Sequence, residues 1–174
     1  MDYKEITLDK IDVIKGVPYH NNKYLEFWTP ELYLPYGLEH HDNKFGEKYE
    51  VKLSFRDQQG NFLRKFMNKI NSLDAYFKHI HKGTEYHPMI KSGNLVIKLP
   101  YGGTTFQCTV KSNFEGLPTV FSLKKGCWVR CLIRAEKVWL YQKRSGCLLV
   151  AKQFIILNQT EQQEEQPGDS LENE

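Results

Sequence analysis

Short stretches in which apolar and polar residues alternate, separated by turn-rich connections, constrain the fold of this chain more than any other feature. In residues 49–55, every second residue is apolar. Alternation with a period of two is typical of a strand that buries one face. The other segments with strand character are residues 94–99, 104–111, 119–123, 126–135, 137–142 and 147–157. Short strands joined by short loops predict an antiparallel meander or a small barrel.

One segment, residues 61–81, has a helical period instead. Its apolar residues recur every three or four positions: Phe62, Phe66, Ile70, Leu73, Phe77 and Ile80. This spacing predicts an amphipathic helix, which we expect to pack its apolar stripe on the barrel. Asn71 and Ser72 leave a division into two shorter helices open.

The first 45 residues give a weaker signal. Residues 26–41 are rich in aromatic side chains but are interrupted by Pro30, Pro35 and Gly37. Because proline cannot donate to a strand ladder, this composition predicts an extended edge segment with turns rather than a central strand.

Charge is distributed unevenly along the chain. The net charge is +3, yet residues 158–174 contain six acids and neither Lys nor Arg. Taking those six from the 21 acids of the chain leaves 15 against 24 Lys and Arg in residues 1–157. A segment whose one apolar residue is Leu171 cannot offset the entropy cost of ordering. We therefore expect one basic β-rich domain over residues 1–157 and a disordered acidic tail over residues 158–174.

The sequence lacks the common signatures of catalysis. It contains neither a phosphate-binding glycine loop nor a GxSxG nucleophile motif. Its six histidines do not combine with Cys at zinc-ligand spacing, and its carboxylates are scattered. We predict no cofactor, no metal and no enzymatic activity. The four cysteines form no CxxC pair, and we expect them to be buried free thiols.

The chain shows no run of about 18 or more apolar residues, and its first ten residues are charged throughout, unlike a signal peptide. We expect a soluble, intracellular protein without a membrane partner.

The stretch GCWVRCLIRAEKVWLY, residues 126–141, combines two Trp, two Arg and one Tyr. Within a strand, Trp128, Arg130 and Arg134 share one face. A hairpin turn near residues 136–137 would bring Trp139, Tyr141 and Lys143 onto the same sheet surface, if the strand register allows it. Unpaired bases stack on aromatic rings while cations contact phosphates. The candidate set for such a surface is Trp128, Arg130, Arg134, Trp139, Tyr141, Lys143, Arg144, Lys98 and Lys111.

These residues favour a protein that binds single-stranded DNA without sequence specificity and performs no chemistry, with RNA left open. A flexible polyanion tethered near a basic groove can occupy that groove until a strand displaces it, and it can recruit basic partner proteins. The alternative is a β-rich structural, assembly or protein-interaction subunit, in which residues 27–37 form an interface. An exposed edge strand can also pair with its copy, which makes a homodimer a further hypothesis.

A basic barrel, followed by the strands LKKGCWVRCLIRAEKVWL and GCLLVAKQFIIL and then an acidic tail, resembles the phage-type single-stranded DNA-binding proteins. It resembles more closely their relatives in nucleocytoplasmic large DNA viruses. The resemblance covers residues 94–174 and implies an OB-fold, a five-stranded Greek-key barrel that binds the strand on one sheet face. It also implies roles in DNA replication and recombination, at a viral replication site in the host cytoplasm or nucleus. The residues that it places on the binding face are Trp128, Arg130, Arg134 and Trp139.

Overall fold

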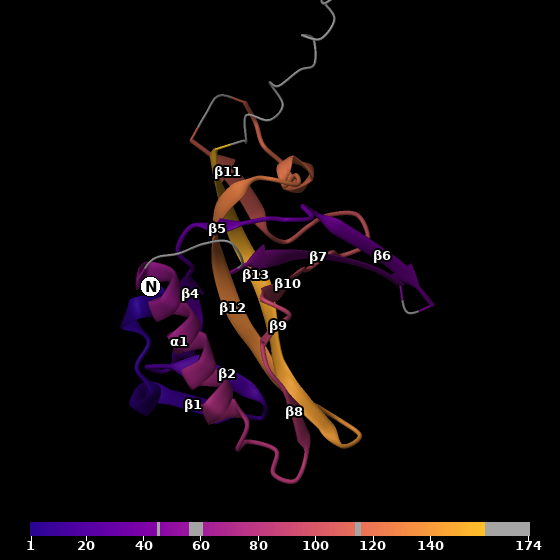
Figure 1. Cartoon of the computed structure of the whole chain (residues 1–174). Helices are drawn as coiled ribbons and strands as arrows, with labels where there is room; N and C mark the ends of the chain where they lie inside the picture. The colour runs from indigo at the N-terminus through magenta and orange to yellow at the C-terminus, as the bar shows by residue number, and fades with distance from the viewer. Residues whose placement is uncertain (45, 56–60, 114–115, 159–174) are drawn as a thin grey trace, which may run out of the picture.

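The computed structural model describes the chain apart from residues 45, 56–60, 114–115 and 159–174 (Figure 1). Its helical segments are α1 (Asn61–Phe77) and the short 3-10 helices η1 (Tyr3–Glu5), η2 (Leu8–Lys10) and η3 (Val120–Ser122). Its strands are β1 (Ile11–Ile14), β2 (Val17–His20), β3 (Lys23–Tyr24), β4 (Glu26–Trp28), β5 (Leu32–Tyr33), β6 (Glu39–Asn43), β7 (Gly46–Ser54), β8 (Glu85–His87), β9 (Ile90–Lys91), β10 (Asn94–Leu99), β11 (Thr109–Ser112), β12 (Trp128–Tyr141) and β13 (Arg144–Asn158). Beyond Asn158, the predicted acidic tail lies outside the described residues.

Five strands close on themselves into a barrel. β12 and β13 form a long antiparallel hairpin, and β13 meets β10 in parallel at Lys98 and Val150. β10 then pairs with β7, β7 with β5, and β5 with β12, all antiparallel. In chain order, β5, β7, β10, β12 and β13 are strands one to five of a Greek-key barrel of the OB type. The predicted fold class, mainly β with an elaborated OB-like barrel and one long helix, is confirmed.

Alternation along the strands builds the core. The inward-facing apolar side chains have almost no exposed surface: Val51, Leu53, Leu95, Ile97, Leu99, Val129, Cys131 and Ile133. α1 lies alongside β4 and the small antiparallel sheet of β1, β2 and β3 (Figure 1). Its Phe66, Ile70, Leu73 and Phe77 are buried, as the helical period predicts. The helix is continuous through Ser72 and ends at Phe77 rather than at the predicted residue 81.

The predicted turn near residues 136–137 is wrong, because β12 runs without a break from Trp128 to Tyr141. The ladder has Ala135 opposite Leu149 but Lys137 opposite Leu148, so Glu136 is an extra residue, a β-bulge. Glu and Lys lack the turn chemistry of Gly, Asn or Asp, and the hairpin turns instead at residues 142–143.

The bulge at Glu136 reverses the alternation of β12. Before it, odd-numbered residues such as Ala135 are buried; after it, Val138 is buried and Trp139 is half-buried. Trp139 therefore lies on the same outer side of the strand as Trp128. The two tryptophans are nevertheless eleven positions apart, roughly 36 Å along an extended strand.

Three other sequence predictions need correction. Residues 119–123 form η3 rather than a strand, because Thr119 caps this turn by accepting a hydrogen bond from the Phe121 N–H at 3.2 Å. Within residues 104–111, strand structure is limited to the start of β11, from Thr109 onward. In the aromatic N-terminal segment, β4 lies at the edge of the sheet as predicted, but β5 is a barrel strand between β7 and β12.

The four cysteines are free thiols; Cys108, Cys127 and Cys131 are buried and Cys147 is half-buried. Burial raises the pKa of the Cys108 thiol to about 11 and raises those of Cys131 and Cys147 as well. These three thiols stay protonated at neutral pH, as expected of structural cysteines. Among the described residues, no helix combines the length and apolar character needed to cross a membrane.

Candidate nucleic-acid interface

The predicted site residues fall into two regions of the barrel surface. Trp139 and Lys98 belong to the side formed by β7, β10 and the end of the β12–β13 hairpin. Tyr141, Lys143 and Arg144 lie at the tip of the same hairpin. Trp128, Arg130, Arg134 and Lys111 belong to the side formed by β4, β5, β11 and the other end of that hairpin. The continuous course of β12 is the reason for this separation.

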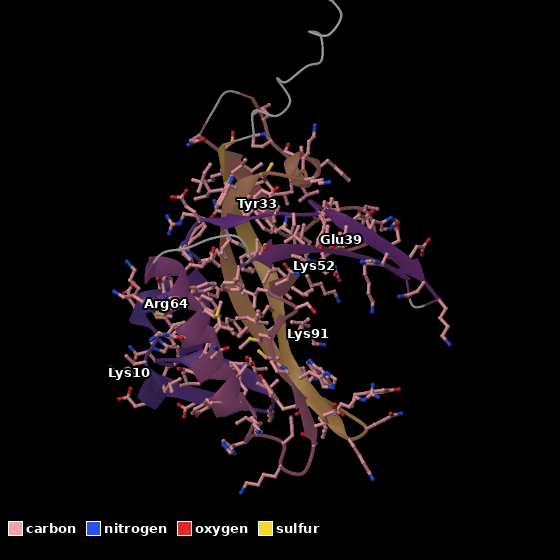
Figure 2. All side chains as sticks on the ribbon, in the orientation of Figure 1. Lys10, Tyr33, Glu39, Lys52, Arg64 and Lys91 are labelled. Atoms are coloured by element: carbon pink, nitrogen blue, oxygen red, sulfur yellow. The ribbon has the colours of Figure 1, made fainter. Side chains whose placement is uncertain are left out.

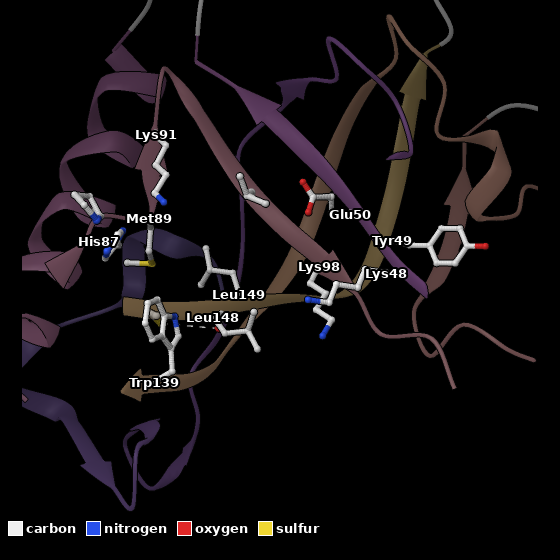
Figure 3. Close-up of a pocket in the computed structure, with 13 residues that line it drawn as sticks. Lys48, Tyr49, Glu50, His87, Met89, Lys91, Lys98, Trp139, Leu148 and Leu149 are labelled. Carbon is white, nitrogen blue, oxygen red and sulfur yellow. Dashed lines mark hydrogen bonds between the residues drawn. The ribbon is translucent and has the colours of Figure 1, made fainter. Parts of the chain in front are cut away.

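The first region is hollowed into a groove with a cavity volume of about 360 Å³ (Figure 3). β7 and β10 form its floor, the β12–β13 hairpin forms one wall, and the segment from His87 to Lys91 forms another. We refer to this depression as the groove. The lining residues that matter below are Lys48, Lys91, Lys98, His87 and Trp139.

The indole of Trp139 is held against the backbone of the neighbouring strand. Trp139 lies opposite Gly146 in the β12–β13 ladder. A Cβ atom at position 146 would lie only 2.7 Å from Cζ2 of the indole, so the ring packs directly on this glycine. The ring of His87 lies 6.0 Å from it, centroid to centroid. Trp139 is half-buried, and a fixed aromatic ring therefore lines the groove.

Asp74 of α1 fixes the wall that carries His87. The Tyr86 hydroxyl donates to its carboxylate at 2.6 Å, and the Met89 N–H donates at 3.2 Å. Burial raises the pKa of Asp74, although both hydrogen bonds act in the opposite direction. Since Tyr86 and Met89 flank His87 in the chain, Asp74 sets the position of this histidine beside Trp139.

The groove carries an excess of positive charge. Lys48, Lys91 and Lys98 form no ion pair within the described part of the chain. Glu50 also lines the groove, but its carboxylate lies 3.8 Å from the amine of Lys52. Figure 3 shows Lys48 and Lys98 next to each other, while the Tyr49 ring points away to the other side of β7.

In the second region, aromatic rings and cations alternate. The rings of Trp128 and Tyr33 are 5.4 Å apart, and the Arg130 guanidinium lies 5.5 Å from the centre of the Trp28 ring. The Arg130 Nε donates to the Thr29 carbonyl at 3.2 Å. Within the described residues Arg130 has no acidic partner, so its charge is not neutralised by the protein.

Arg134 differs from Arg130 because its charge is compensated. Its guanidinium lies 2.6 Å from the Glu26 carboxylate, 3.9 Å from that of Glu136, and 4.2 Å from the centre of the Tyr24 ring. These contacts hold β4 against β12. Arg134 therefore offers less to an anion than its place in the sequence suggested.

Sequence reasoning did not find Lys48, Lys91 or His87. Lys48 had a signal, because it lies in phase with the polar face of residues 49–55, which is the outer face of β7. His87 and Lys91 belong to strands of three and two residues, too short to show a period.

One solved structure is similar to this chain. It is the single-stranded DNA-binding protein from bacteriophage Enc34, C-terminal truncation, with 14% sequence identity and a TM-score of 0.49. The match covers 87% of this chain and 95% of that one. No protein-family model and no curated protein matches the sequence. The resemblance to relatives in large DNA viruses stays a prediction.

No three His, Cys, Asp or Glu side chains gather into a possible metal site in the described portion of the structure. What the groove presents to a ligand is one aromatic ring, one imidazole and lysine amines, a combination suited to binding a polyanion with flat, unpaired bases.

Proposed function

We propose that this protein binds single-stranded DNA without sequence specificity, in the groove and without catalysing a reaction. The observation that carries the proposal is Trp139, fixed on Gly146 beside Lys48, Lys91 and Lys98. The groove lies on the face of strands two and three of the barrel, next to the loop between strands four and five. OB-folds bind oligonucleotides with this face and this loop.

In this mechanism the lysines contact phosphates and a base stacks on Trp139. Stacking contributes roughly 1 to 3 kcal/mol per base and tolerates any base, because every base has a π face. The exposed tip of the same hairpin, with Tyr141, Lys143 and Arg144, extends the contact beyond Trp139. Nothing in this arrangement depends on the sugar, and RNA is a second ligand to be tested.

The wider role that we propose is protection of single strands during DNA replication and recombination, with a viral, intracellular setting following from the resemblance. Residues 159–174 supply an acidic segment that competes with the strand for the groove and recruits replication proteins. Pairing of exposed edge strands in a homodimer belongs to the same proposal.

The test is the affinity for a fluorescently labelled oligo-dT as a function of salt, measured by anisotropy. The variant Lys48→Gln/Lys91→Gln/Lys98→Gln removes the lysines of the groove. The salt slope is the steepness with which the logarithm of the affinity falls with the logarithm of the salt concentration. Each lost phosphate contact lowers this slope by about 0.7 for a single strand, so it falls by about 2 in the triple variant. The control, Arg64→Gln/Lys65→Gln/Lys78→Gln, removes the same charge from α1 and the residue that follows it, and leaves the slope near that of wild type.

Equal losses in the two triple variants would mean that net charge alone attracts DNA and would overturn the groove as the site. If the wild-type protein bound neither DNA nor RNA at low salt, the alternative of an assembly or protein-interaction subunit would be favoured.

A further inference from the structure

We infer that the barrel carries a second contact surface for the same strand, across β7 and β5 from the groove; this inference rests on the proposed function. We call this surface the platform. Its residues are Tyr33, Trp128, Trp28, Arg130 and Lys111. A strand long enough to reach both surfaces is held at its two ends and less firmly between them.

Strand register places the platform close to the groove. Asn94 on β10 lies opposite Ser54 on β7, Ser54 lies opposite Tyr33 on β5, and Tyr33 lies opposite Trp128 on β12. This row crosses three strand spacings, about 14 Å in all. Val96, which lines the groove, is two residues from Asn94 and faces the same side. The path around the barrel is therefore much shorter than the path along β12.

A second row supplies the cations of the platform. Lys111 on β11 and Arg130 on β12 both lie opposite Ile155 of β13, one on each side. Lys111 is exposed, and like Arg130 it has no acidic partner among the described residues. Two uncompensated cations thus flank one strand beside the paired rings of Trp128 and Tyr33. Interleaved rings and cations are what an unpaired strand requires.

The surface between groove and platform has a different character. Tyr36 is 51% exposed, and the Lys52 amine lies 5.5 Å from the centre of its ring. That amine is already bound by Glu39 at 3.0 Å and lies 3.8 Å from Glu50. Figure 2 shows Tyr33, Lys52 and Lys91 one after another down this side, with Arg64 on the opposite side. Among the described residues, this intervening surface offers the Tyr36 ring for stacking, while the charge of Lys52 is already compensated.

This arrangement predicts that affinity depends on oligonucleotide length. An oligo-dT of about 6 nucleotides fills the groove alone, whereas one of about 30 reaches the platform as well. The variant Arg130→Gln/Lys111→Gln keeps every aromatic ring. For the 30-mer its salt slope falls by about 1.4, and near 0.1 M salt its affinity falls roughly ten- to thirty-fold. For the 6-mer its affinity and slope match those of wild type.

Two further variants separate a lost DNA contact from misfolding and from a general effect of charge. Lys111→Gln alone changes an exposed residue, leaves the Arg130 to Thr29 hydrogen bond intact, and still lowers the slope for the 30-mer by about 0.7. The control Arg64→Gln/Lys65→Gln removes as much charge as Arg130→Gln/Lys111→Gln, and it binds both the 6-mer and the 30-mer as wild type does. Unchanged binding of the 30-mer by the platform variants, or an equal loss for both lengths, would overturn the platform. If the groove variant bound both lengths as wild type does, the proposed function itself would fail.

Discussion

At the scale of single residues, the candidate site depends on a contact that a motif search does not reveal. Gly146 has no side chain, and the indole of Trp139 occupies the space where one would be. The sequence identified Trp139 as a candidate, but a cross-strand glycine shows its role only when the register is known. For Arg134, strand register makes the residue a weaker candidate. The pairing of β12 with β4 places Glu26 opposite Arg134, and its carboxylate neutralises the guanidinium.

Gly146→Ala should therefore weaken DNA binding without removing any group that contacts DNA. The new methyl group displaces the half-buried indole, while an ordinary strand conformation accepts alanine. We expect affinity for oligo-dT to fall by up to the value of one stacked base, about 1 to 3 kcal/mol. The measurement combines a binding isotherm with the emission maximum of tryptophan fluorescence.

Gly102→Ala is the matched control, because a Cβ there meets atoms only at 3.7 Å or more. A shifted emission maximum with unchanged affinity in Gly146→Ala would show that Trp139 does not contact the strand.

At the scale of elements, alternation predicted β7, β10 and β13 well because each is long and buries one face. It failed where tertiary pairing decides the structure. β5 has two residues and owes its place in the barrel to β7 and β12, and the bulge at Glu136 has no residue signature. The groove likewise depends on tertiary pairing, because Lys48, Lys91 and Lys98 come from three separate strands.

The contact between α1 and the segment from β8 to β9 has a dependence on pH with a definite sign. Burial raises the pKa of Asp74, so the folded state disfavours its ionised form. The contribution of protonated Asp74 to the stability of the fold is fully present below its ordinary pKa of 3.8. It is lost as the pH rises through the pKa that Asp74 has in the folded state. In Asp74→Asn this loss is absent, and the amide oxygen can still accept from Tyr86.

We therefore expect the free energy of unfolding of Asp74→Asn, relative to wild type, to increase as the pH rises from about 4 toward neutrality. Urea denaturation at a series of pH values measures it. A difference that stays constant with pH, or that decreases, would contradict the raised pKa.

At the scale of the whole molecule, the composition showed a basic body but not where its charge gathers. Closure of the barrel brings cations of β7, β9 and β10 into one groove and leaves Arg64 of α1 on another side (Figure 2). The acidic tail, residues 159–174, starts directly after the strand end at which Asn158 lies opposite Trp128.

Deleting residues 159–174 should tighten binding of oligo-dT at low salt, because it removes a tethered polyanion that competes for the same cations. The gain should shrink as salt screens both interactions. Anisotropy titrations of the full chain and the truncated chain test this. Equal affinities at low salt would remove the competition model and leave the groove unaffected.

The most direct test of the central claim is the quenching of tryptophan fluorescence as an oligo-dT of about 30 nucleotides is added, with matched duplex and several salt concentrations alongside. We predict strong quenching by the single strand with a steep salt dependence, a much weaker response to duplex, and loss of a large part of the quenching in Trp139→Ala. Absence of quenching and of competition by DNA at low salt would contradict the claim that this barrel binds single strands.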